Sequence, residues 1–376
     1  MSEVLEDGIS NLPGSILHHI LSFADTRDAA RTCVLSKRWK FIWRSIPILE
    51  FSCKNSSQAN SFGDFVDTTL ELHDGSNIQN FILDASVLSN ESRIGKWITT
   101  VLSHNVEDFT LQLTIRYSVL MPPSLFTCES LIKLRLYSGP IICFPKYISL
   151  PRLERFLLFG ALFKDECWND QLFSNCPELQ FLFLGSCTWA ATHNVCISNP
   201  SLQKLIISNP KHQDGFQNCA FEIQAPSLED LTYKGIVAKD YDLSSFPSLV
   251  EAHIDFYFDV YNTTWEQAIH YGAVISKFLR ALAHVVYLTI SDRTLQIITV
   301  ADDLRNHIPS YPHLNELCLT QKVIADEALI VLLEKTPNLK SLKFKRFVPS
   351  FPGEEEDDIG DASDDVSEDN HNNDAA

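Results

Sequence analysis

The sequence predicts an α+β protein in which a small helical unit precedes an α/β solenoid and an acidic tail. Three observations predict this organisation. Two short helix patterns occupy the first fifty residues, a six-residue apolar pattern recurs through the middle of the chain, and residues 354–374 hold eleven carboxylates without any Lys or Arg. A chain of 376 residues is too long for one compact core, so at least two folded units are expected.

The helical unit is predicted from residues 12–23, LPGSILHHILSF, and residues 31–43, RTCVLSKRWKFIW. Leu12-Pro13 suits a helix start, because proline loses no intrahelical hydrogen bond there. Side chains four residues apart share a helix face, and this spacing gives two adjoining apolar rows, Ile16 with Ile20 and Leu17 with Leu21. So small a unit cannot bury all of its apolar surface, and we therefore expect it to dock on a partner.

Residues 7–43 resemble the F-box of plant proteins. From Asp7 to Trp43 they match the family pattern D-x-I-S-x-L-P…L-S-K-R-W-x-x-L-W nearly throughout. Ala24-Asp25 replaces the usual Leu-Pro, which predicts a longer first helix and weaker docking. The resemblance implies that residues 7–50 bind a Skp-family adaptor and, through it, the cullin of a ubiquitin ligase. The implied adaptor contacts are Leu12, Pro13, Ile16, Leu17, Ile20, Leu21, Val34, Leu35, Lys37 and Trp39. A helical cap on the solenoid, without an adaptor, is the alternative.

The middle of the chain repeats an L-x-x-L-x-L pattern with apolar replacements. Copies begin at Ile78, Val106, Leu131, Leu153, Leu179, Leu202, Leu228, Leu249, Val285, Leu314 and Leu339. Their spacing of 21 to 36 residues is typical of leucine-rich repeats, and the alternation within each copy predicts a short strand. We expect residues 76–347 to form an irregular leucine-rich-repeat solenoid with parallel strands on a concave face. An ordinary α/β domain is the alternative.

Segments around and within the repeats carry further predictions. Residues 51–75 are expected to connect the two units. Residues 268–283 follow a helix pattern, which predicts a helix on the convex side or over a rim of the solenoid. LLEKTPNLKSLKF at 332–344 resembles the FBD region of plant F-box proteins, so the solenoid from about residue 285 is expected to be FBD-like. Residues 348–376 are expected to be disordered, because they are acidic and poor in apolar side chains.

The alternate strand positions predict a target-binding surface on the concave face. An apolar patch across three adjacent strands, flanked by two arginines, would comprise Leu157, Phe159, Phe181, Phe183 and Ile206 with Arg135 and Arg155. Exposed apolar patches with aromatic and arginine side chains commonly bind proteins. Two alternatives stay open. Residues 256–261 or the 268–283 helix could cover the patch, or a one-residue shift in register could place it in the core.

Composition and motifs argue against several other functions. Removing the eleven tail carboxylates from the net charge of −18 leaves only −7, which argues against nucleic acid as a partner. No apolar run reaches the length of a membrane span, and no secretory signal precedes the helices.

Motifs for chemistry are also missing. Phosphate-binding and nucleophile motifs are absent, and the ten cysteines never form C-x-x-C, so neither a cofactor nor a metal is expected. Asp64 and Asp67 show no partner for acid–base catalysis. We expect a non-catalytic substrate-recognition subunit in the cytoplasm or nucleus, with an unknown target protein. A scaffold or small-molecule sensor without ubiquitin transfer is the alternative.

Overall fold

The protein is described from a computed structural model. The residues that the structure describes are 9, 11–53, 59–84, 91–113, 119–137, 140–142, 144, 147–163, 168–189, 193–209, 215–243, 246–257, 264–299, 308–320 and 326–345. The acidic tail, for which the sequence predicts disorder, lies outside these residues.

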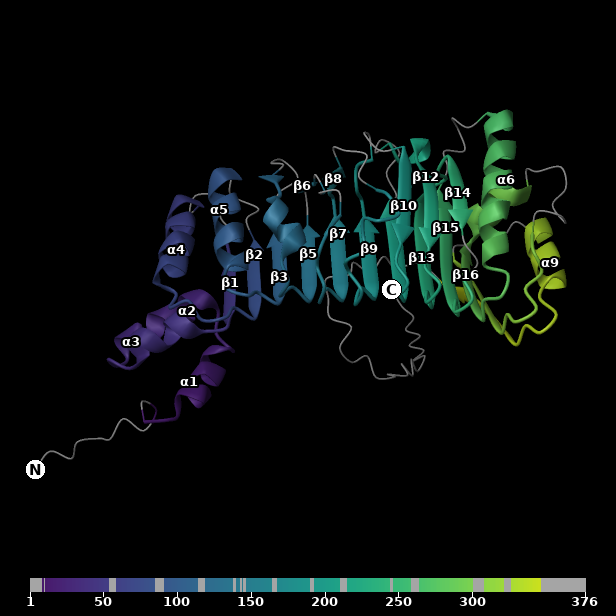
Figure 1. Cartoon of the computed structure of the whole chain (residues 1–376). Helices are drawn as coiled ribbons and strands as arrows, with labels where there is room; N and C mark the ends of the chain where they lie inside the picture. The colour runs from purple at the N-terminus through teal and green to yellow at the C-terminus, as the bar shows by residue number, and fades with distance from the viewer. Residues whose placement is uncertain are drawn as a thin grey trace, which may run out of the picture.

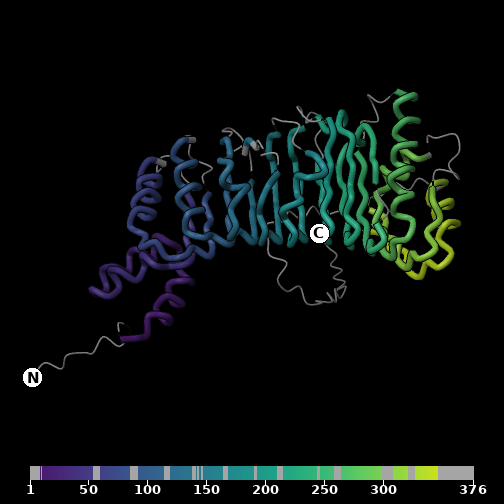
Figure 2. Tube along the Cα trace, in the orientation of Figure 1, coloured from purple at the N-terminus to yellow at the C-terminus, as the bar shows by residue number. Residues whose placement is uncertain are grey.

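Twelve strands within the described residues form one parallel sheet along the length of the molecule (Figure 1). Each inner strand pairs with the strands of the previous and the next coil, so that the order along the sheet follows the sequence. The strands are β1 (Ile48–Ser52), β2 (Asn80–Asp84), β3 (Asp108–Gln112), β5 (Lys133–Tyr137), β7 (Arg155–Phe159), β9 (Phe181–Gly185), β11 (Lys204–Asn209), β13 (Asp230–Ile236), β15 (Glu251–Tyr257), β16 (Tyr287–Ser291), β17 (Glu316–Thr320) and β18 (Ser341–Lys345). The resulting solenoid is elongated (Figure 2).

All eleven predicted repeats form a coil of this solenoid. In each, the strand begins two residues after the first apolar position of the repeat, for example at Lys204 after Leu202. The prediction for residues 51–75 is wrong. That segment contains the end of β1 and helix α4 (Ala59–Leu72), because residues 46–51 already carry the same apolar spacing and pair with β2.

The core lies on one side of the sheet, where the alternate apolar side chains of each strand are buried. Helices α4 and α5 (Glu91–Leu102) cover the first coils. Two small three-stranded sheets and two 3₁₀ turns cover the middle coils. The first sheet contains β4 (Val119–Leu120), β6 (Pro140–Ile142) and β8 (Leu162–Phe163), and the second contains β10 (Asn194–Ser198), β12 (Ala220–Gln224) and β14 (Asp240–Leu243). The turns are η4 (Pro123–Thr127) and η5 (Phe216–Asn218). Helices α6 (Trp265–Ala281), α7 (Asp292–Thr299) and α9 (Asp326–Glu334) cover the last.

The helix predicted at residues 268–283 is confirmed as α6. It begins earlier than predicted because Thr264 and Gln267 form a capping box, in which each side chain accepts a hydrogen bond from the other residue's backbone N–H. The helix packs against β14 and α7, on the core side of the sheet.

A backbone ladder joins the coils at the residue preceding each strand, and we call these positions the rim. Except in the last described coil, each rim carbonyl accepts two N–H groups from the next coil. Glu107 O, for example, accepts from Ile132 N at 2.7 Å and Lys133 N at 3.0 Å. The rim residues are Pro47, Gln79, Glu107, Ile132, Glu154, Gln180, Gln203, Glu229, Val250, Val286, Asn315 and Lys340.

The N-terminal unit consists of α1 (Gly14–Leu21), α2 (Thr26–Arg31) and α3 (Trp39–Ile42), with 3₁₀ turns η1 (Thr32–Val34) and η2 (Trp43–Ser45). It packs against the β1 end of the sheet (Figure 1) and shares the core of the solenoid. The prediction of a longer first helix is wrong: α1 ends at Leu21, and the Asp25 side chain caps α2 by accepting from Asp28 N–H at 2.7 Å.

Candidate functional site

The N-terminal unit divides its apolar side chains between two surfaces. Pro13, Ile16, Ile20, Val34, Leu35 and Lys37 are exposed, as an adaptor-binding role requires, and Leu12 is partly buried. The same expectation is wrong for Leu17, Leu21 and Trp39, which are buried within the chain's own core. One apolar row of α1 therefore packs inward, and the adjoining row remains outside.

Other exposed apolar side chains on this unit were missed by the sequence reasoning. Phe23 is 79% exposed, and Ile9 and Phe41 are also exposed. The Phe23 ring meets the His19 ring edge-on, with 5.0 Å between centroids, and the Arg44 guanidinium lies 5.3 Å from the Phe41 centroid. Phe23 matches the F-box pattern, so the resemblance could have indicated it, whereas helix periodicity alone could not.

The concentration of exposed apolar groups distinguishes this unit from the solenoid. Among the described residues, eighteen large apolar side chains are exposed, and seven of them lie between residues 9 and 41. Apolar surface gathered in this way marks a protein-binding site.

The predicted register of the repeats is confirmed on the opposite side of the sheet, which we call the open face. Leu157, Phe181 and Phe183 form an apolar cluster separate from the main core, and Phe159 and Ile206 pack against it. Register pairs Leu157 with Phe183 and Phe183 with Ile206 across three strands. The expectation of an exposed patch is wrong for Leu157, Phe181 and Phe183, which are only 3–7% exposed.

Close packing within this cluster accounts for part of its burial. The Phe159 and Phe183 rings lie nearly parallel, with centroids 6.5 Å apart and 13° between their planes. They lie over Gly185, where an added Cβ would come within 2.5 Å of the Phe183 ring. The exposed Arg155 guanidinium lies 4.4 Å from the Phe181 centroid, which is a cation–π contact.

Neither segment expected to cover the patch is shown to do so. α6 packs on the core side, and Phe256 is itself a core residue. Residues 258–261 lie outside the described residues.

The charged groups flanking the cluster are largely engaged within the chain. Arg135 donates to Asp108 Oδ1 at 2.7 Å and to Thr110 Oγ1 at 3.2 Å, and Lys204 lies 3.1 Å from Asp230 Oδ2. Arg135, which the sequence predicts beside the patch, is therefore paired within the chain. Farther along the open face, burial lowers the pKa of Lys234, against the opposing effect of the facing Asp255 carboxylate.

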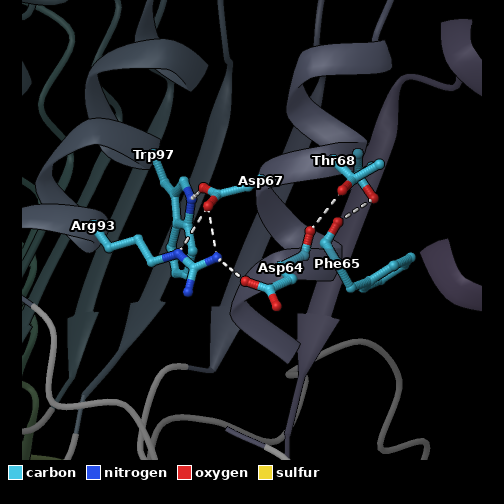
Figure 3. Close-up of polar contacts among 7 residues, drawn as sticks. Asp64, Phe65, Asp67, Thr68, Arg93 and Trp97 are labelled. Atoms are coloured by element: carbon cyan, nitrogen blue, oxygen red, sulfur yellow. Dashed lines mark hydrogen bonds and ion pairs between the residues drawn. The ribbon is translucent and has the colours of Figure 1, made fainter. Parts of the chain in front are cut away.

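The acidic residues of α4 form a structural network (Figure 3). Arg93 of α5 places Nη2 2.6 Å from both Asp64 Oδ1 and Asp67 Oδ2, and Trp97 Nε1 donates to Asp67 Oδ1 at 2.5 Å. Burial alone would raise the pKa of Asp67, but the hydrogen bonds from Trp97 and Arg93 outweigh it and lower the pKa. These carboxylates are occupied in fastening α4 to α5.

Other reactive groups in the described residues offer no catalytic arrangement. Burial raises the pKa of Cys176 and Cys196 to about 11, so both thiols stay protonated at neutral pH. The described part of the chain holds no group of three or more His, Cys, Asp or Glu placed to bind a metal ion. None of its helices combines the length and the apolar character that a membrane crossing requires.

A helical unit with an exposed apolar row, joined to a parallel-strand solenoid, defines an F-box followed by leucine-rich repeats. Comparison with known proteins agrees. The F-box domain model matches residues 9–51, and the model for the leucine-rich repeats of the FBD-associated F-box protein At5g56370 matches residues 94–247.

Arabidopsis thaliana F-box/LRR-repeat proteins are similar over nearly the whole chain. At4g14096 is 30% identical over 357 residues, covering 91% of this chain and 74% of that protein, and At4g14103 is 30% identical, covering 91% and 92%. At3g59190 is 29% identical, covering 92% and 94%. The chain belongs to the plant F-box/LRR-repeat family. The FBD-like character of residues from about 285 stays a prediction.

Proposed function

We propose that this protein is the substrate-recognition subunit of a Skp–cullin–F-box ubiquitin ligase. Residues 9–51 would bind a Skp-family adaptor, and the repeats would hold a target protein for ubiquitination. No bond chemistry takes place on this chain. It raises the effective concentration of the target near the charged ubiquitin-conjugating enzyme, which converts a bimolecular encounter into one within a single assembly.

The observation that carries the proposal is the exposed apolar row of the N-terminal unit. Ile16, Ile20, Val34 and Leu35 remain accessible although the same unit buries Leu17, Leu21 and Trp39. A structural cap would need only the buried set. The exposed set favours binding of a second polypeptide, and a Skp-family adaptor is the partner that an F-box generally binds.

Adaptor binding is tested with the full chain and a purified Skp-family adaptor, by calorimetry. We expect the double variant V34D/L35D to bind at least a hundredfold more weakly, because central apolar anchors each contribute about 2 kcal/mol or more to an interface. Leu120→Asp is the matched control, since Leu120 is also exposed, at 55%, but lies in the solenoid. Unchanged adaptor binding by V34D/L35D, with wild-type thermal stability, would contradict the proposal.

The repeats supply the target-binding part of the proposal. Leu157, Phe181 and Phe183 would support the shape of the open face, while Arg155, Phe159 and Ile206 would be the members of the predicted patch that a target reaches. Proximity labelling in plant cells, with and without proteasome inhibition, should enrich the same proteins for wild type and L120D. It should lose them for R155E/I206D. We place this activity in the cytoplasm or nucleus.

A further inference from the structure

A groove of about 800 Å³ runs along the rim of the last four coils. Its lining includes the rim residues Val250, Val286, Asn315 and Lys340, together with His284 and His313 from the turns before β16 and β17. His284 Nε2 donates to the Phe246 carbonyl, which holds the His284 ring in place beside the groove. The groove is therefore formed by consecutive turns of the solenoid, and at least one of its lining side chains is held in place by a hydrogen bond.

The chemistry of the rim changes at this groove. The rim of earlier coils carries Glu107, Glu154 and Glu229, whereas no residue lining the groove is acidic. In a chain with a net charge of −18, this stretch offers Lys340 and two histidines beside apolar surface. Val250, which lines the groove, is 41% exposed.

The length of the groove limits what can occupy it. Four neighbouring parallel strands span about 14 Å, at about 4.8 Å between strands. An extended peptide covers that distance with about four residues, at roughly 3.4 Å each. A short extended segment fits, with carboxylates able to meet Lys340 and His313 and an apolar side chain able to cover Val250 and Val286.

We propose that this groove binds a short, extended, acidic segment of the target protein, with its apolar side chains on Val250 and Val286. The inference rests on the proposed function, because it names the part of the target that the solenoid recognises. Opposite charge supplies the selectivity: a basic segment would meet Lys340 as a like charge and would be rejected.

Two labelled peptides serve as probes, one of alternating Glu and Leu and one of alternating Lys and Leu, each six residues long. Binding to the full chain, with and without a Skp-family adaptor, is measured by fluorescence anisotropy. We expect the Glu peptide to bind at least tenfold more tightly than the Lys peptide. Val250→Asp and Lys340→Glu should each lower the affinity for the Glu peptide at least tenfold. The matched controls Leu120→Asp and Lys96→Glu, exposed elsewhere on the chain, should leave it unchanged.

The remaining outcomes overturn the proposal. Equal affinity for the two peptides, or no effect of Val250→Asp and Lys340→Glu, would show that the groove does not select acidic segments. If the Glu peptide binds only after residues 354–374 are deleted, the occupant is the chain's own acidic tail. If V250D abolishes a concentration-dependent dimer, the occupant is a second copy. Adaptor binding is measured separately on wild type and on every variant. A wild-type chain that does not bind the adaptor would contradict the proposed ligase function, but not the proposal that the groove binds acidic segments.

Discussion

The two ends of the long sheet are finished in different ways (Figure 1). At the first end, β1 is covered by the N-terminal helices, and Leu49 and Phe51 at its core positions are buried. At the last end, Leu342 and Phe344 occupy the equivalent positions of β18 but are 38% and 57% exposed. Within the described residues, β18 has a strand on one side only.

This difference shows what the F-box contributes to the solenoid. A repeat buries its apolar positions only when a neighbour stacks on it, so a terminal coil needs a cap. The inner row of the F-box provides that cap through Leu17 and Leu21, and its outer row, with Ile16 and Ile20, stays available for an adaptor. The same short unit thus caps the sheet and leaves exposed the apolar row to which we propose that an adaptor binds.

The largest expected effect comes from truncating matched leucines at the two ends. Leu49→Ala should lower the free energy of unfolding by about 2–5 kcal/mol, because it leaves a cavity in a closed core. Leu342→Ala should cost about 1 kcal/mol or less, since its side chain is already partly in water. Denaturant unfolding of both variants measures the contrast. Equal losses would break it, and would mean that the β18 end is covered in solution.

The next effect concerns the polar contact that closes the capped end. Buried Thr26 Oγ1 of α2 accepts from Glu50 N–H of β1 at 2.7 Å. Thr26→Val keeps the shape but leaves that N–H without a partner, which should cost about 1–3 kcal/mol. Thr127→Val is the control, because the Thr127 hydroxyl bonds only within its own exposed turn. A wild-type melting temperature for T26V would show that this contact does not fasten the F-box to the sheet.

The sequence predicts strand positions well and exposure poorly, for physical reasons. The apolar spacing located eleven strands, and it also exists at Ile46, Leu49 and Phe51, where the overlap with the F-box pattern concealed β1. Alternation fixes which face a side chain lies on. It does not say whether that face is covered, which is why Phe183 was expected to be exposed although it is buried.

Long-range partners were also beyond the reach of spacing rules. Asp67 meets Arg93 twenty-six residues later, and Arg135 meets Asp108 twenty-seven residues earlier, each from a neighbouring coil. These separations in sequence depend on the number of residues in each coil, which varies along the chain. Only the stacking of the coils brings such pairs together.

The smallest expected effect concerns helices α4 and α5, nearest the capped end. An ion pair between Arg93 and Asp67 joins these helices in addition to their apolar packing (Figure 3). Asp67→Asn should cost about 1–2 kcal/mol at pH 7, because the hydrogen bonds from Arg93 and Trp97 would lose a charged acceptor. At the other end, α7 and α9 pack through apolar groups such as Leu295, Ala328 and Val331.

The direction of the Asp67 pKa sets the pH dependence of this effect. Because the folded state lowers the pKa of Asp67 below its ordinary value of 3.8, the carboxylate stabilises the fold fully above pH 3.8. The contribution is lost as pH falls through the lower, folded pKa. Thermal melts should therefore separate wild type from D67N at pH 7, and this separation should shrink as the pH falls below 3.8. Asp242→Asn, an exposed carboxylate on β14, is the control that should match wild type at pH 7. If the D67N gap persists unchanged at pH 2, the charge of Asp67 contributes nothing, and helix packing alone joins the first coils as it does the last.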